Sequence, residues 1–215
     1  MRITKIIHSC LLIETDVARI LTDVGSMNPA APDVANLDAI LITHEHADHF
    51  DIEKLKVVLA NNPQATVITH EAVGVKLAEA GIAYTPIEPG EKVEVEGVTI
   101  ESYGSEHAQI HSSIPVCRNT GYLIADRLYI PGDALHDVPP KQVEILALPV
   151  GGPWLKISEA IDYAIKLKPK VAFPIHDAMY VDVFQKDFVP RWCTGPLEKE
   201  GILFKNIFAD ETLTL

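Results

Sequence analysis

Thr43-His44-Glu45-His46-Ala47-Asp48-His49-Phe50 follows directly on the apolar run Leu37-Asp38-Ala39-Ile40-Leu41-Ile42, and the expected architecture depends on this junction. A short apolar run bounded by polar clusters is typical of a buried strand. The three imidazoles and two carboxylates that follow it therefore lie in a loop at the C-terminal end of a strand, where α/β folds place reactive groups. Imidazole nitrogen and carboxylate oxygen are ligands for Zn²⁺, Fe²⁺ and Mn²⁺. Because crowding these groups is costly without a compensating cation, the loop predicts a metal site rather than a solvated polar loop.

The spacing His44-x-His46-x-Asp48-His49 matches the HxHxDH signature of the metallo-β-lactamase-fold hydrolases. In its first 177 residues, up to about Asp177, the chain resembles the small, stand-alone, ascorbate-phosphate-lactonase-like members of that superfamily. The resemblance implies an α+β fold, a four-layer αββα sandwich of two similar halves. The metal site is then expected between the inner ends of the two sheets.

The order of expected elements agrees with such a sandwich. Alternating or continuous apolar runs predict strands, at residues 3–7, 11–14, 17–23, 37–42, 66–69, 82–86, 92–95, 98–103, 121–125, 128–130, 143–148, 171–175 and 202–207. Apolar residues spaced three and four apart predict helices, at residues 51–60, 71–80, 158–167 and 183–192. Strands followed by βα units occur twice, which predicts two similar halves of one domain that covers residues 1–215.

The composition limits the class of protein. The net charge is −12, from 30 acidic and 18 basic residues, and no Lys/Arg cluster is present that could follow a nucleic-acid backbone. No apolar stretch approaches membrane length, and the N-terminus lacks the pattern of a signal peptide. Three cysteines without CxxC spacing predict reduced thiols in a cytoplasmic protein, with Cys10 and Cys117 packed in the core. We expect no nucleic-acid or membrane partner, and homo-oligomerisation stays open.

A pair of metals needs more ligands than one loop can supply. Three later residues each follow a predicted strand, namely His107, Asp133 and His176. By the resemblance, one metal is held by His44, His46 and His107, the other by Asp48, His49 and His176, and Asp133 bridges both. His111, four residues after His107, is an alternative ligand.

Other residues are candidates for supporting roles. Asp23, in Thr22-Asp23-Val24-Gly25, is similar to the family's aspartate that supports the metal loop without binding metal. His8 is a candidate to face the site, and Trp154 and Tyr180 are candidate substrate walls.

The resemblance implies a hydrolase with two divalent metal ions, with Zn²⁺ favoured and Mn²⁺ or Fe²⁺ as alternatives. A metal-bridging hydroxide would cleave an ester, lactone or phosphoester bond of a small molecule, and the site cations could attract an anionic one. Asp48 is the catalytic candidate, because it would bind metal and also orient the hydroxide. Two rival hypotheses are a mononuclear iron enzyme similar to the persulfide dioxygenases and a metal-binding domain without turnover.

Overall fold

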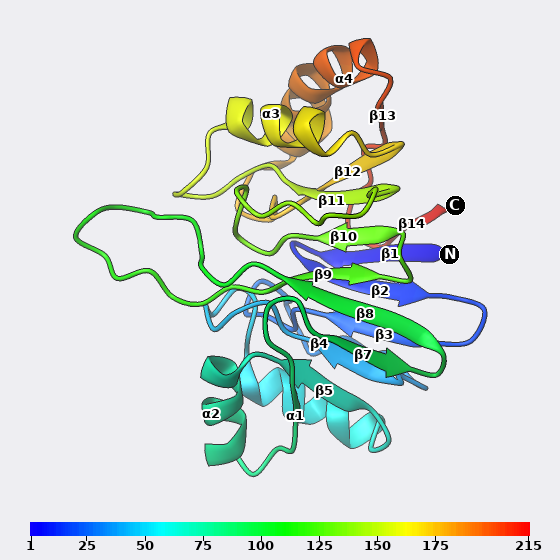
Figure 1. The fold of residues 1–215 in the computed structure, drawn as a ribbon, viewed down its shortest axis with the longest axis vertical. Coiled ribbons are helices and arrows are strands. Elements are labelled where there is room, and N and C mark those ends of the chain that lie inside the picture. The colour runs from blue at the N-terminus through cyan, green and yellow to red at the C-terminus, as the bar shows by residue number, and fades with distance from the viewer.

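The computed structural model describes residues 1–215 as two mixed sheets packed face to face, with helices on both outer faces (Figure 1). The predicted αββα sandwich is therefore confirmed. The strand order of the first sheet is β14-β1-β2-β3-β4-β5-β6, and that of the second is β13-β12-β11-β10-β9-β8-β7.

The first sheet is built mainly from the first half of the chain. Its strands are β1 (Arg2–Ile7), β2 (Cys10–Glu14), β3 (Arg19–Thr22), β4 (Ala39–Leu41), β5 (Thr66–Thr69), β6 (Thr85–Pro86) and β14 (Glu211–Thr214). The second sheet contains β7 (Lys92–Val95), β8 (Val98–Tyr103), β9 (Gly121–Ile124), β10 (Leu128–Ile130), β11 (Ile145–Pro149), β12 (Val171–Ile175) and β13 (Leu203–Phe204).

The four helices divide between the two outer faces. α1 (Ile52–Asn61) and α2 (Glu71–Glu79) pack on the first sheet through a buried cluster that joins Leu55 and Leu77 to Ile40. α3 (Ile157–Leu167) and α4 (Val189–Lys199) pack on the second sheet, and a short π-helix, η1 (Phe184–Phe188), leads into α4. A third and larger apolar cluster fills the space between the two sheets. None of the helices combines the length and apolar composition that crossing a bilayer requires.

The entry into α1 shows why the histidine-rich loop ends where it does. Asp51 caps the helix, because its carboxylate accepts hydrogen bonds from the backbone N–H groups of Glu53 and Lys54. At the other end, the buried Asn62 side chain donates to Val58 O and accepts from Leu37 N–H, at 2.9 Å in each case. The end of α1 is thereby tied to the segment that enters β4.

Two predictions near the C-terminus were wrong. The expected strand at 202–207 shortens to β13, and the chain then returns to the first sheet, where β14 pairs antiparallel with β1. The expected helix at 183–192 divides into η1 and α4, and α4 continues to Lys199 despite Pro196. Burial of Cys193 and Leu197 against α3 and the second sheet outweighs the helix-breaking tendency of the proline.

Candidate metal centre

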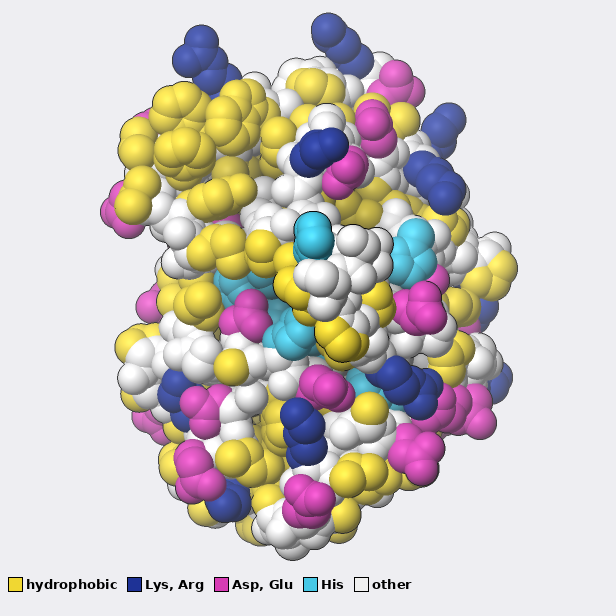
Figure 2. Space-filling model, turned by 90° about the vertical axis from the view of Figure 1, so that its left-hand side faces the viewer, with side chains coloured by type: hydrophobic (Ala, Val, Ile, Leu, Met, Phe, Trp, Pro, Cys, Tyr) yellow, Lys and Arg dark blue, Asp and Glu magenta, His cyan; other side chains and the backbone are white.

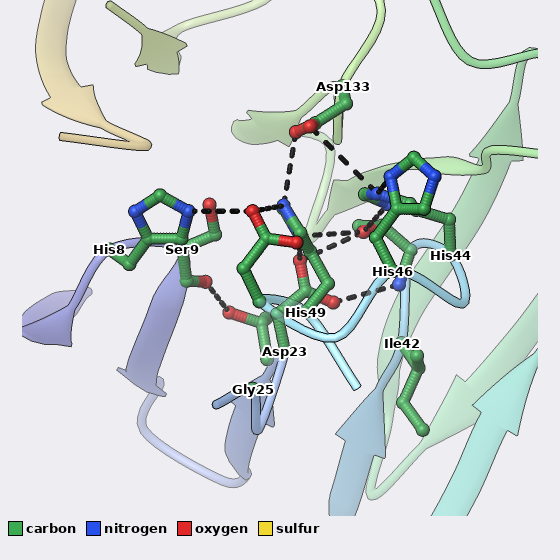
Figure 3. A network of polar contacts seen from close by, with 12 residues as sticks. His8, Ser9, Asp23, Gly25, Ile42, His44, His46, His49 and Asp133 are labelled. Atoms are coloured by element: carbon green, nitrogen blue, oxygen red, sulfur yellow. Dashed lines mark hydrogen bonds and ion pairs between the residues drawn. The ribbon is translucent and has the colours of Figure 1, made fainter. Parts of the chain in front are cut away.

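All seven predicted ligand residues gather in two neighbouring groups, and Figure 3 shows four of them, His44, His46, His49 and Asp133. They come from four loops, each of which follows a strand: β4, β8, β10 and β12. On the space-filling surface, histidine side chains lie in a recess beside the projecting loop between β8 and β9 (Figure 2). The convergence depends on both sheets, since β4 belongs to the first and the other three strands belong to the second.

The side chains form two groups whose potential ligand atoms lie within 4.8 Å of one another. One group is His44, His46, His107 and Asp133, and the other is His8, Asp48, His49 and His176. Asp133 contacts both groups. Its Oδ2 lies 3.3 Å from His107 Nε2 and 3.0 Å from His176 Nε2, and its Oδ1 lies 3.2 Å from His49 Nε2. Asp133 therefore occupies the position expected of a bridging carboxylate, and the metal-binding role of these residues stays a prediction.

Several of these atoms are buried without a hydrogen-bond partner. They are Nε2 of His49, His107 and His176, and Oδ1 of Asp133. Buried polar atoms in folded proteins are nearly always hydrogen-bonded, so such a cluster needs another source of compensation. A divalent cation bound by imidazole nitrogen and carboxylate oxygen would supply it, and the donor set fits Zn²⁺, Mn²⁺ or Fe²⁺.

Asp23 positions the histidine-rich loop by accepting hydrogen bonds from Thr43 and His49. Its Oδ2 accepts from His49 Nδ1 at 2.7 Å and from the Thr43 hydroxyl at 2.9 Å, and its Oδ1 accepts from Thr43 N–H at 2.8 Å. Because the Thr43 hydroxyl uses its one hydrogen in the bond to Asp23, its oxygen accepts a hydrogen bond from His44 Nδ1, 3.0 Å away. Both rings then carry their proton on Nδ1, which leaves the Nε2 lone pairs facing the centre of the site.

Gly25 allows this loop to lie close to the end of the first sheet. A Cβ atom at Gly25 would lie 1.7 Å from the backbone oxygen of Asp48, so no larger residue fits. His107 is oriented in the same way as His44 and His49, since its Nδ1 is hydrogen-bonded to Ala108 O.

The charges of the two groups compensate one another in the absence of metal. Burial alone would raise the pKa of Asp133, but His49 and His176 hold that pKa well below its usual range. Burial alone would lower the pKa of His176, but Asp133 and Asp48 outweigh it and raise the pKa to about 9. A second ring proton, on Nε2 of His49 or His176, would thus take the place of a cation, and metal binding is expected to release it and leave the Nε2 lone pair free.

The structure separates the two candidates for the third-motif ligand. His107 is buried within the first group, whereas His111 is exposed and contacts Ser113 in the projecting loop.

The expectation that Cys117 packs in the core was wrong. Its thiol is half-buried at the site, with Sγ 3.5 Å from His46 Nε2, because the loop between β8 and β9 returns across His46.

Trp154 forms one wall of the site. Its Nε1 donates to Asp133 Oδ2 at 2.9 Å, and its ring centroid lies 5.7 Å from that of His107 and 5.8 Å from that of His176. Beyond it lies a cavity of about 390 Å³, lined by Ala108, Leu135, His136, Trp154, Glu159, Asp162, Tyr163 and Lys166. Tyr180 has a supporting contact instead, because its hydroxyl donates to Val150 O at 3.2 Å.

A buried ion pair beneath His176 was missed by sequence reasoning. Lys5 Nζ, on β1, donates to Asp177 Oδ2 at 2.7 Å and to Pro174 O at 2.9 Å. Both side chains are almost fully buried. One signal was present, because Lys5 follows the core residue Ile3 by two positions on the same face of the strand.

Comparison with known proteins gives a consistent set of similarities. Residues 2–176 match the family model described as the beta-lactamase superfamily domain. Protein Rv0786c of Mycobacterium tuberculosis is 40% identical over 184 residues, covering 83% of this chain and 85% of that protein. The UPF0173 metal-dependent hydrolase TV0864 of Thermoplasma volcanium is 28% identical, covering 84% of each chain. Among solved structures, Igni18, a metallo hydrolase from Ignicoccus hospitalis, has a TM-score of 0.77 at 19% identity, covering 99% of this chain and 97% of that chain.

Proposed function

This chain belongs to the beta-lactamase superfamily, and we propose that it is a metal-dependent hydrolase that cleaves an ester, lactone or phosphoester bond of a small molecule. The observation that carries the proposal is the pair of neighbouring His/Asp groups that Asp133 connects by its contacts with His49 and His176, with buried and unpartnered Nε2 atoms in both groups. A similar protein from Thermoplasma volcanium carries the name metal-dependent hydrolase.

The first metal would be held by His44, His46 and His107, the second by Asp48, His49 and His176, with Asp133 shared. Two divalent cations in these positions, with Zn²⁺ favoured, would polarise the scissile carbonyl or phosphoryl group and make water a nucleophile near neutral pH.

We assign to Asp48 the role of orienting the attacking water. Its side chain is 24% exposed, whereas that of Asp133 is 3% exposed, so Asp48 faces the open side of the site. Its carboxylate would hold the water by accepting a hydrogen bond while the water oxygen attacks the carbonyl carbon or phosphorus. It would then take the proton and return it to the departing oxygen.

The substrate would lie against Trp154 and extend into the adjoining cavity. A volume of about 390 Å³ fits a small molecule, and Leu135, Trp154 and Tyr163 provide apolar walls. The polar side of this cavity carries both signs, from Glu159, Asp162 and Lys166, so an anionic group would pair with Lys166.

Metal analysis and a substrate panel test the proposal together. We expect about two zinc or manganese ions per chain, and hydrolysis of at least one member of a panel of lactones, phosphodiesters and thioesters. The substitution His46→Ala should abolish both readouts, with His111→Ala, an exposed histidine, as the matched control. A single iron per chain with oxygen consumption would instead indicate the dioxygenase, and full metal loading without turnover would indicate a binding domain.

A further inference from the structure

His8 lies among the candidate ligands of the second group, but its hydrogen bonds differ from theirs. It occupies the turn between β1 and β2, with a side chain that is 1% exposed and a ring centroid 4.0 Å from that of His176. Its Nε2 lies 3.3 Å from Asp48 Oδ2, and its Nδ1 accepts a hydrogen bond from the backbone N–H of Ala178 at 3.2 Å.

The contact with Ala178 determines the tautomer of His8. A backbone N–H can only donate, so His8 Nδ1 must offer its lone pair and cannot carry a proton. The ring proton is then on Nε2, where it is donated to Asp48 Oδ2. An imidazole nitrogen needs a free lone pair to bind a metal. His44 and His49 have the opposite arrangement, with Nδ1 protonated towards Thr43 or Asp23 and the Nε2 lone pair free.

We propose that His8 is a positioning residue that binds no metal and holds the Asp48 carboxylate in place by donating a hydrogen bond from Nε2. This inference rests on the metal site of the proposed function. Asp48 Oδ2 lies 3.3 Å from His8 Nε2 and 3.4 Å from His176 Nε2, and if His176 binds metal, His8 is the partner left to donate a hydrogen bond to this carboxylate, the more exposed of the two in the groups. His8 itself is held on two sides, because its backbone oxygen accepts from His176 N–H at 3.2 Å and its ring accepts from Ala178.

Two substitutions test the roles of the two ring nitrogen atoms of His8 separately. In His8→Asn the amide oxygen takes the place of Nδ1 and keeps the contact with Ala178, but the side chain is too short to reach Asp48. Asparagine also tolerates the backbone φ of 55° at this position. In His8→Gln the amide nitrogen takes the place of Nε2 and can still donate to Asp48.

Metal titrations of these variants give the first readout. We expect His8→Asn to lower the affinity for the second Zn²⁺ by about 10–100-fold, because removing a residue that hydrogen-bonds to a metal ligand typically has an effect of this size. At saturation this variant should still bind two Zn²⁺ per chain. His8→Gln should restore the affinity to within a few-fold of wild type. His176→Ala serves as the comparison in which a metal ligand is removed, and this variant should bind one metal fewer per chain. The inference is overturned if His8→Asn also loses one metal at saturation, or if His8→Gln binds no more tightly than His8→Asn.

Long-range ¹H–¹⁵N spectra of the protein loaded with ¹¹³Cd²⁺ give a direct readout that does not depend on activity. We expect the rings of His49 and His176 to couple to ¹¹³Cd, and His8 to show no coupling and a protonated Nε2. Coupling of ¹¹³Cd to His8 would overturn the inference alone. An absence of coupling to every histidine would overturn the proposed metal site, and the inference with it.

Discussion

The buried pair between Lys5 and Asp177 leads to the sharpest prediction about stability. Lys5 Nζ donates to Asp177 Oδ2 at 2.7 Å and to the backbone oxygens of Pro174 and Ile207, and both charged side chains are at most 5% exposed. The substitution Lys5→Met keeps the length of the side chain but leaves the Asp177 carboxylate without its cation. Leaving one partner of a buried pair unpaired typically costs about 3–5 kcal/mol, so we expect the free energy of unfolding to fall by that amount.

The pKa of Lys5 shows how burial limits the contribution of the intact pair to stability. Desolvation lowers the pKa of Lys5 even though Asp177 opposes this shift, so removing the ammonium group from water costs more than the attraction returns. The double variant Lys5→Met/Asp177→Asn should therefore be less destabilised than the sum of the two single variants, by roughly 1–3 kcal/mol.

Urea denaturation of the four metal-free proteins, followed by circular dichroism, measures this cycle. The matched control is Lys186→Met, which breaks an exposed pair with Asp182 at a similar distance of 2.8 Å and should change stability little. Additive losses, within about 0.5 kcal/mol, would refute the reasoning, because the two charges would then not depend on each other.

Further predictions concern the metal site. His46→Ala should abolish metal uptake and hydrolysis, and an unchanged metal content measured by mass spectrometry would count against its assignment. His107→Ala should lower the metal content more than His111→Ala, because His107 is buried in the first group and His111 is exposed. A larger loss of metal in His111→Ala would indicate that His111 is the ligand instead. Asp23→Asn should weaken Zn²⁺ binding by about 10–100-fold in a competition assay with a chelator, since asparagine has one acceptor oxygen for the three donors, His49 Nδ1, the Thr43 hydroxyl and Thr43 N–H, that the two carboxylate oxygens accept from. In the metal-free protein the pKa of His176 rises from 6.5 to about 9, because neighbouring carboxylates outweigh burial. This contribution to stability is complete below pH 6.5 and is lost as the pH rises towards 9, so thermal unfolding should show decreasing stability over that range, and bound Zn²⁺ should remove the dependence.

The fold could be predicted because local patterns and the overall architecture agree. The apolar run before Thr43 forms a strand that is buried throughout, and the loop after it carries the clustered histidines. His107, Asp133 and His176 could be located for the same reason, since each follows a strand that ends at the same edge of the sandwich. Their position after strands made them candidates, and their assignment as ligands rested on the resemblance to the later metal motifs of the superfamily, which occur in the same order.

Contacts that depend on the packing of distant segments could not be predicted. Lys5 and Asp177 are 172 residues apart, and nothing in the local sequence of either indicates its partner. Cys117 lies among apolar residues in the sequence, yet the path of the loop between β8 and β9 brings its thiol to His46. β14 was missed because it is a short edge strand, and its pairing with β1 determines its conformation more than its own residues do.

The tautomers at the site show how the two halves of the chain depend on each other. Asp23 and Thr43, from the first sheet, orient His44 and His49. The loop after β12, from the second sheet, orients His8 through the N–H of Ala178, although His8 belongs to the first sheet. A cation bound between Asp133 and these imidazoles would therefore join the two sheets directly. Because the site forms only when both sheets are docked, metal binding should stabilise the sandwich as a whole as well as the loops that hold it.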